Sequence, residues 1–198
     1  MRVLTEWITI MGIFRGVLKG KQLCFIGRSV ELGKDVRLSP LVLIDDNVVI
    51  GGGTFIGFGC VMRSNIVIGE GCSFGHHTVV EKGVVIGNNV RIHSLCHIAD
   101  EVVIGDEVFM GPGLKTSNVK EITSWGIPNT FYNYKAVVEP PRIKKGARIG
   151  VGVLLLPGIV VGEGSFIHAG SIVVKDVPDF AVVAGIPGRI LGRVKSSG

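Results

Sequence analysis

The chain has few charged residues, few aromatic residues and few cysteines. Asp, Glu, Lys and Arg make up only 19% of the 198 residues, which excludes an intrinsically disordered chain. Four cysteines are too few for a disulfide scaffold, and no unbroken apolar run approaches the ~20 residues of a transmembrane helix. Aromatic residues amount to 7%, whereas there are 30 glycines. This composition favours a chain that turns often and packs small side chains.

The most informative pattern is a six-residue repeat. Steps of six from Ile26 to Met110 give fifteen positions, all of them apolar, and the next residue is Gly at nine of them. The fifth position of each hexad is mostly small or β-branched. A second block of hexads begins at Ile143, 33 residues after Met110 and therefore out of step with the first. This period predicts a β-solenoid with three hexads per coil, whose first and fifth hexad positions point inward.

Three segments lie outside the repeat. Apolar residues near the N-terminus follow helical spacing, which predicts a helix that caps the solenoid or, as an alternative, a basic amphipathic anchor at a membrane surface. The aromatic-rich segment between the two blocks is long, and ordered loops of such length are usually functional. We therefore expect an N-terminal helical cap at 1–24, β-helix coils at 25–113 and 142–176, an excursion loop at 114–141 and a C-terminal tail at 177–198.

The hexads and the tail resemble a known family. From about residue 25 to 190, the [LIV]-G-x-x-[VTC]-x hexads and the terminal stretch KDVPDFAVVAGIPGRI are similar to the hexapeptide-repeat acyltransferases, in the branch that acetylates sugars and polysaccharides. The resemblance implies an all-β, left-handed parallel β-helix that assembles as a homotrimer. It also implies acetyl-CoA as the acyl donor, no metal, and a sugar or nucleotide-sugar acceptor that takes the acetyl group on oxygen or nitrogen.

The net charge of +5 is concentrated near the C-terminus. From residue 139 onward there are eight basic and four acidic residues, which favours a polyanionic partner. A nucleic acid is disfavoured because no recognisable binding module is present. The resemblance implies instead that this partner is coenzyme A, held by Gly150, Gly152, Ala169, Gly170, Lys175, Arg189 and Arg193.

Two columns of outward positions indicate an interface between solenoids. One column contains Val49, Val67, Val85 and Val103, and the other contains Leu43, Val61, Val79 and His97. Valines facing water in a stripe would form an exposed apolar patch, so burial against a neighbouring subunit is the simpler explanation. The second column continues to Lys115, so His97 is expected about one strand spacing from the base of the excursion.

The candidates for chemistry surround this point. Acyl transfer needs a base that deprotonates the acceptor, and we expect His97, or else His93, to supply it. The excursion contains no His, although galactoside and xenobiotic acetyltransferases of the family carry their catalytic His there. The candidates for substrate binding are Asn118, Asp100, Glu139, Trp125, Tyr132 and Tyr134. Among these, Asn118 matches the closing Asn of a motif in aminosugar N-acetyltransferases, and Asp100 takes the catalytic His position of related sugar-lipid acyltransferases.

Two alternatives stay open at this point. The same fold hosts γ-class carbonic anhydrases, but His93 and His97 are four residues apart, whereas that family separates two zinc ligands by five. A non-catalytic structural solenoid is the second alternative. Three cysteines occupy the inward fifth position, where they are expected to be core residues. Free core thiols fit a cytoplasmic protein, with membrane association through residues 1–24 as an added expectation.

Overall fold

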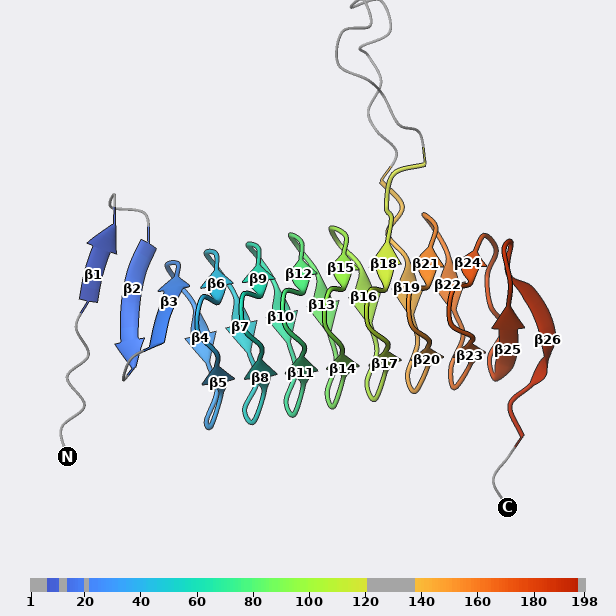
Figure 1. Ribbon diagram of the computed structural model, residues 1–198, viewed down its shortest axis with the longest axis horizontal. Helices are drawn as coiled ribbons and strands as arrows, with labels where there is room; N and C mark the ends of the chain where they lie inside the picture. Colours follow the sequence, from blue (N-terminus) through green and yellow to red (C-terminus); the bar gives the residue numbers. More distant parts are fainter. Residues whose placement is uncertain (1–6, 11–13, 20–21, 121–137, 196–198) are drawn as a thin grey trace, which may run out of the picture.

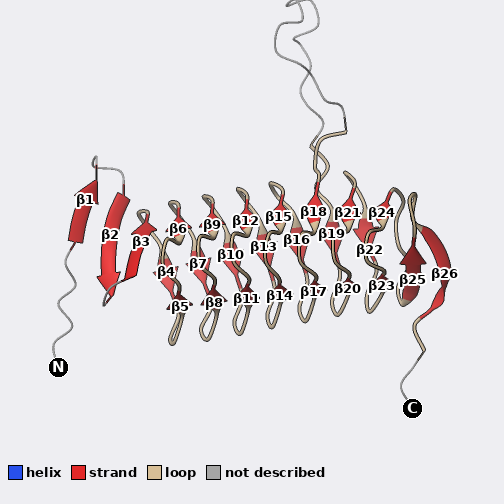
Figure 2. Cartoon of the chain, in the orientation of Figure 1, coloured by secondary structure: helices blue, strands red, loops and turns tan. Residues whose placement is uncertain are grey.

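The computed structural model describes residues 7–10, 14–19, 22–120 and 138–195, and every regular element in these ranges is a β-strand (Figure 1 and Figure 2). Most strands have two residues and belong to one of three sheets that run along the molecule. Sheet A contains β1 (Trp7–Ile10), β2 (Phe14–Lys19), β3 (Gln22–Ile26), β6 (Leu43–Ile44), β9 (Val61–Met62), β12 (Val79–Val80), β15 (His97–Ile98), β18 (Lys115–Thr116), β21 (Leu154–Leu155) and β24 (Ile172–Val173).

The strands of sheets B and C also follow one another along the long axis of the molecule. Sheet B contains β4 (Glu31–Leu32), β7 (Val49–Ile50), β10 (Val67–Ile68), β13 (Val85–Ile86), β16 (Val103–Ile104), β19 (Arg142–Ile143) and β22 (Val160–Val161). Sheet C contains β5 (Arg37–Leu38), β8 (Phe55–Ile56), β11 (Ser73–Phe74), β14 (Arg91–Ile92), β17 (Phe109–Met110), β20 (Arg148–Ile149), β23 (Phe166–Ile167), β25 (Ala181–Ala184) and β26 (Arg189–Arg193). The chain passes through sheets B, C and A in turn, which makes a solenoid with one strand per face.

The register follows the sequence repeat. Val67 pairs in parallel with Val49 on one side and Val85 on the other, each 18 residues away. Short corners connect the faces, and we call them the AB corner (for example 45–48), the BC corner (51–54) and the CA corner (57–60). The third corner residue commonly has a positive φ, as in Asn47 at 58° and Gly53 at 69°. Gly and Asn are the residues that adopt this conformation most readily, which explains their frequency at the corners.

The core consists of the predicted inward positions. The first hexad position is almost fully buried from Ile44 to Met110, and so is the fifth position from Val42 to Leu114. Burial is less complete in the first coil, where Leu32 is 43% exposed because no earlier coil covers sheet B there. The inward pointing of both positions is therefore confirmed.

The inward cysteines are core residues, as predicted. The Cys60 thiol donates a hydrogen bond to the Gly75 carbonyl at 2.9 Å, and Cys96 bonds Gly111 in the same way at 3.3 Å. Burial raises the pKa of the Cys60 and Cys96 thiols, which keeps them protonated. These thiols therefore lack the character of nucleophiles.

Glycine after the inward position is required by the closeness of the coils. A Cβ atom at Gly75 would lie 2.2 Å from the backbone nitrogen of Ser94 in the next coil. The obstacle is backbone that is held in the sheet, so a larger residue would force neighbouring coils apart.

The expectation of an N-terminal helical cap is wrong. β1 and β2 are strands that pair antiparallel with each other, and β2 pairs antiparallel with β3. The first coil leaves an open edge of unpaired backbone N–H and C=O groups. An added strand forms hydrogen bonds with these groups, whereas a helix uses its own backbone groups internally. This requirement overrides the helical spacing of the side chains. No helix in the described ranges is long and apolar enough to cross a membrane.

The excursion leaves sheet A after β18. Its base is closed by an antiparallel bridge between Val119 and Val138. Ile143 then pairs with Ile104, 39 residues away instead of 18, so 21 residues are inserted without breaking sheet B. The predicted site residues Trp125, Tyr132 and Tyr134 lie outside the described residues.

Candidate active site

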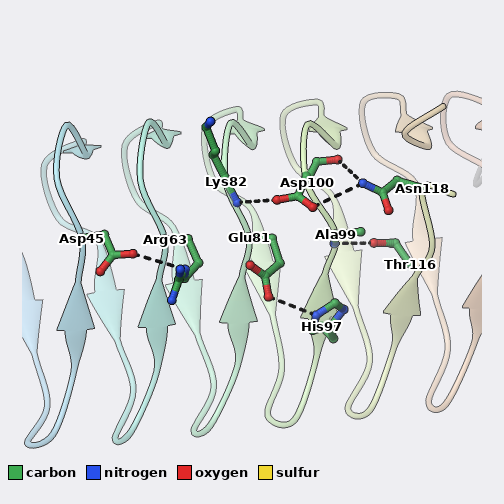
Figure 3. Close-up of polar contacts among 9 residues, drawn as sticks. All are labelled: Asp45, Arg63, Glu81, Lys82, His97, Ala99, Asp100, Thr116 and Asn118. Carbon is green, nitrogen blue, oxygen red and sulfur yellow. Dashed lines mark hydrogen bonds and ion pairs between the residues drawn. The ribbon is translucent and has the colours of Figure 1, made fainter. Parts of the chain in front are cut away.

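The outward edge of sheet A brings together charged side chains from successive coils (Figure 3). His97 lies on β15, and its Nε2 is 3.4 Å from the Oε1 of Glu81, which follows β12 in the preceding coil. The two side chains are 45% and 30% exposed. A carboxylate that contacts one imidazole nitrogen orients the ring and leaves the other nitrogen to act as a general base.

Sequence analysis did not identify Glu81. Its position follows from the 18-residue coil. Val79 of β12 pairs with His97 of β15, and Glu81 is the first residue of the AB corner that follows β12. A carboxylate 16 residues before a His on the outward face is therefore the signal that points to such a pair.

His97 also lies where the excursion begins. It pairs with Lys115, the residue that opens β18, as the column of outward positions predicted. In β18, the next residue, Thr116, is buried and accepts a hydrogen bond from the Ala99 backbone N–H at 2.8 Å. The base of the excursion is thereby fixed to the coil that carries His97.

The second predicted base lies on a different face. His93 opens a CA corner, and its ring packs on Phe109 of sheet C with the ring centroids 5.1 Å apart. Its backbone N–H donates to the Met110 carbonyl at 2.9 Å. The structure therefore does not bring the two histidines to one point, and only His97 has a carboxylate partner within 4.0 Å among the described residues.

Three predicted substrate-binding residues form the support of the excursion. The Asn118 amide donates to the Asp100 carbonyl at 3.3 Å and lies 3.5 Å from its Oδ2, while Asp100 Oδ1 accepts from the Lys82 N–H at 3.2 Å. Asn118 is only 9% exposed. Glu139 donates its backbone N–H to the Asn118 carbonyl at 2.8 Å, and its carboxylate pairs with Lys120 at 2.6 Å. These contacts join the two ends of the excursion to each other and to the coil that carries His97 and Asp100.

The predicted coenzyme-binding residues fall into two groups. Gly150, Gly152, Ala169 and Gly170 lie on successive CA corners. Gly152 and Gly170 have φ of 65° and 70°, are exposed, and have no atom within 4 Å of where a Cβ would lie. Gly150 is different, because a Cβ there would lie 2.5 Å from the Ala169 nitrogen. The backbone is therefore uncovered at Gly152 and Gly170, while exposed Val151 and His168 lie on the same two corners.

The basic residues of the predicted site lie beyond these corners. Lys175 and Arg189 line one cleft of about 230 Å³ at the C-terminal end of the solenoid. Arg193 lies farther along β26, where it pairs with Ala181 of β25. The structure thus joins Lys175 and Arg189, whereas Arg193 is not part of the cleft lining.

Nothing in the described ranges resembles a metal centre. No three His, Cys, Asp or Glu side chains from these ranges converge in a way that would hold an ion.

Comparison with known proteins assigns the family. A family model described as the GMPPB C-terminal domain matches residues 20–125, more than half of the chain, so the chain belongs to that domain family. A galactoside O-acetyltransferase from Lactococcus lactis is 30% identical over 97 residues, which are 49% of this chain and 45% of that protein. A serine acetyltransferase from Bacillus subtilis is 57% identical over 51 residues, 26% of this chain and 24% of that protein. These acetyltransferase relatives support the resemblance to hexapeptide-repeat acyltransferases that the hexads predicted.

The family's fold is also matched by solved structures. The structure of a UDP-N-acetylglucosamine acyltransferase from Francisella novicida superimposes with a TM-score of 0.73 at 21% identity, and the match covers 86% of this chain and 62% of that one. The predicted all-β, left-handed parallel β-helix is thereby confirmed. This chain spans less than half the length of the two curated relatives named above, whose activities belong to longer proteins.

Proposed function

We propose that this hexapeptide-repeat protein is an acetyl-CoA-dependent acetyltransferase that acts on a hydroxyl or amine of a sugar. The observation that carries the proposal is the His97–Glu81 pair at the base of the excursion. The galactoside relative supports a sugar acceptor. Because another relative is a serine acetyltransferase, the hydroxyl of serine is a second acceptor to be tested.

The chemistry follows from the orientation of the imidazole. With Nε2 held by Glu81, Nδ1 is the nitrogen that removes the proton from the acceptor O–H or N–H. The acceptor atom then bonds to the thioester carbonyl carbon, and the carbon–sulfur bond breaks. The coenzyme leaves as a thiolate that takes the proton back from the imidazolium, so the step needs no other reactant.

The donor fits the CA corners at Gly152 and Gly170. A thioester on a long flexible arm can lie against the backbone that is uncovered at these two glycines. Negative phosphates are attracted by Lys175 and Arg189 at the C-terminal end of the solenoid. These residues are therefore the proposed coenzyme-binding set within the described part of the chain.

The proposed active form is a homotrimer. The sheet B column of Val49, Val67, Val85 and Val103 lies in register, and each valine is 36–47% exposed in the isolated chain. Packing this column against the aliphatic column of a neighbour's sheet A would bury both. The His97 edge of sheet A would then lie between two subunits, where water is partly excluded and a substrate is enclosed.

The decisive experiment is a thermal melt with and without acetyl-CoA, because a ligand that binds only the folded protein raises its stability. We expect a shift that grows with acetyl-CoA concentration. Gly152→Asn should reduce the shift severalfold, whereas Gly53→Asn should not. Both glycines have a positive φ and open surroundings, so the two variants strain the backbone equally. The absence of a shift at millimolar acetyl-CoA would overturn the proposal.

An acceptor screen completes the test. Release of free coenzyme thiol is measured with galactosides, nucleotide aminosugars and L-serine. A rate with a sugar that exceeds the rate with serine and with water supports the proposed acceptor class. A rate with serine alone would replace it.

A further inference from the structure

The outward face of sheet C differs from the other two faces. In spatial order its residues are Arg37, Phe55, Ser73, Arg91, Phe109, Arg148 and Phe166, which we call the Arg–Phe ladder. Its strands, β5 through β23, run in a straight row along one side of the molecule (Figure 1). Each arginine is followed on the next coil by a phenylalanine, so the ladder contains three Arg–Phe pairs.

Two of the three arginines lie over the ring of the next phenylalanine. The Arg37 guanidinium carbon lies 5.4 Å from the centroid of the Phe55 ring, and Arg148 lies 5.7 Å from that of Phe166. On the other side, His168 packs on Phe166 with centroids 4.8 Å apart. Cation–π contact restrains these two guanidinium groups over the rings.

The arginines of the ladder form no ion pair with the described residues. Arg37, Arg91 and Arg148 are exposed, and no carboxylate of the described ranges lies within 4.0 Å of them. Neither the ladder nor the CA corners on one side of it contain an Asp or Glu, whereas the BC corners on the other side contain Asp35, Glu70, Asp106, Glu107 and Glu163. By contrast, the AB and BC corners contain ion pairs such as Arg63 with Asp45 and Lys145 with Glu107. The charge of the ladder is therefore available to an external anion.

The face is also left open by the proposed trimer. The aliphatic columns that need burial lie on sheets A and B, and sheet C has none. A straight array of six steps at ~4.8 Å extends over ~29 Å, which suits a linear ligand better than a compact one.

We propose that the Arg–Phe ladder binds an extended anionic carbohydrate polymer, one that carries a carboxylate on successive or alternate sugar rings. Guanidinium groups bind carboxylates, and exposed ring faces such as Phe109, which is 37% exposed, pack against sugar rings. The inference rests on the proposed function only for the choice of a carbohydrate. It goes beyond that function because the ladder is on a different face from His97.

Two other polyanions fit the face less well. A nucleic-acid strand presents a charge every ~3.4 Å, far denser than arginines separated by two or three coils at ~4.8 Å each. A membrane surface calls for apolar side chains that project beyond the charges, whereas the rings of Phe55 and Phe166 lie beneath guanidinium groups.

The test is binding of the full chain, without acetyl-CoA, to fluorescent oligogalacturonate, which has one carboxylate per ring. The controls are its neutral methyl ester, a single-stranded oligonucleotide of similar length, and vesicles of phosphatidylcholine with phosphatidylglycerol. We expect oligogalacturonate to bind and its affinity to fall as salt is added. The triple variant Arg37→Gln, Arg91→Gln, Arg148→Gln should lose about tenfold in affinity or more. Arg142→Gln is the matched control, because Arg142 begins an Arg-Ile strand on sheet B just as Arg148 does on sheet C.

The triple variant alters exposed side chains, and its melting temperature checks that it is folded. Replacing the same arginines by Lys should restore part of the affinity, because the charge returns without the planar stacking. Absence of binding to oligogalacturonate, or equal loss in the Arg142 control, would overturn the inference. Tighter, ladder-dependent binding of the oligonucleotide or of the vesicles would overturn it in favour of that partner. The proposed function is judged separately, because its readout is the acetyl-CoA thermal shift.

Discussion

The His97–Glu81 pair allows the sharpest prediction about activity. His97→Asn removes the proposed base and keeps a polar side chain of similar reach. General-base catalysis contributes about 10²- to 10⁴-fold, so we expect kcat to fall by about that factor. The KM for acetyl-CoA should change little, because the corners at Gly152 and Gly170 lie at a different edge.

Glu81→Gln should have a smaller effect. The pair is 3.4 Å apart and both side chains are partly exposed, so their interaction is screened by water. An exposed pair contributes about 1 kcal/mol at most, which corresponds to a roughly fivefold lower rate. The double variant should be no slower than His97→Asn alone, because Glu81 acts through His97.

The assay is steady-state acetyl transfer together with a thermal melt of each variant. The control is Asp45→Asn, which breaks the Asp45–Arg63 pair two coils away on the same edge, at 3.2 Å. All these variants should melt within a few degrees of the wild type, because surface pairs add little stability. A His97→Asn protein that keeps more than a tenth of the wild-type rate would refute the assignment. Equal effects of Glu81→Gln and Asp45→Asn would refute the role of Glu81.

Three further predictions concern the stability and assembly of the solenoid. The backbone N–H of Glu163 and, next, the Lys144 side chain hold the pKa of Asp179 below its ordinary 3.8. The stability that ionised Asp179 adds is therefore complete above pH 3.8 and is lost as the pH falls through the lowered pKa of the folded state. Melting temperatures of Asp179→Asn and the wild type should differ at neutral pH and converge in acid. All four thiols are buried and burial raises their pKa, so a thiol reagent should label the native protein far more slowly than the protein in denaturant, and rapid native labelling would contradict the core assignment. Val67→Glu with Val85→Glu should convert the proposed trimer into monomers, as measured by light scattering, while an unchanged mass would place the interface elsewhere.

The sequence predicted the solenoid well because its repeat is local and regular. Inward residues at Ile44, Ile50 and Ile56 recur every six positions, and each coil only has to match the next. The prediction for the N-terminus was wrong for the complementary reason. Side-chain spacing is a local signal. The pairing of β2 with β3 instead satisfies backbone N–H and C=O groups at the open edge of the sheet, which only the folded solenoid creates.

The candidate site was predicted in part. The 18-residue coil correctly placed His97 beside Lys115, the last outward residue of sheet A before the excursion. It did not separate His97 from His93, which are four residues apart in the sequence but lie on different faces. The sugar acceptor, the trimer and the roles of the site residues stay predictions, to be decided by the experiments above.

The sequence by itself determined the coil period, the inward positions and the family resemblance. All of these follow from which residue types recur at fixed intervals. The tertiary structure alone decided that Glu81 meets His97, that Asn118 contacts Asp100 at the base of the excursion, and that two arginines of sheet C lie over phenylalanine rings. The physical reason is that corners turn the chain by a face every six residues, so neighbours in space come from different coils and only the completed stack sets their distances.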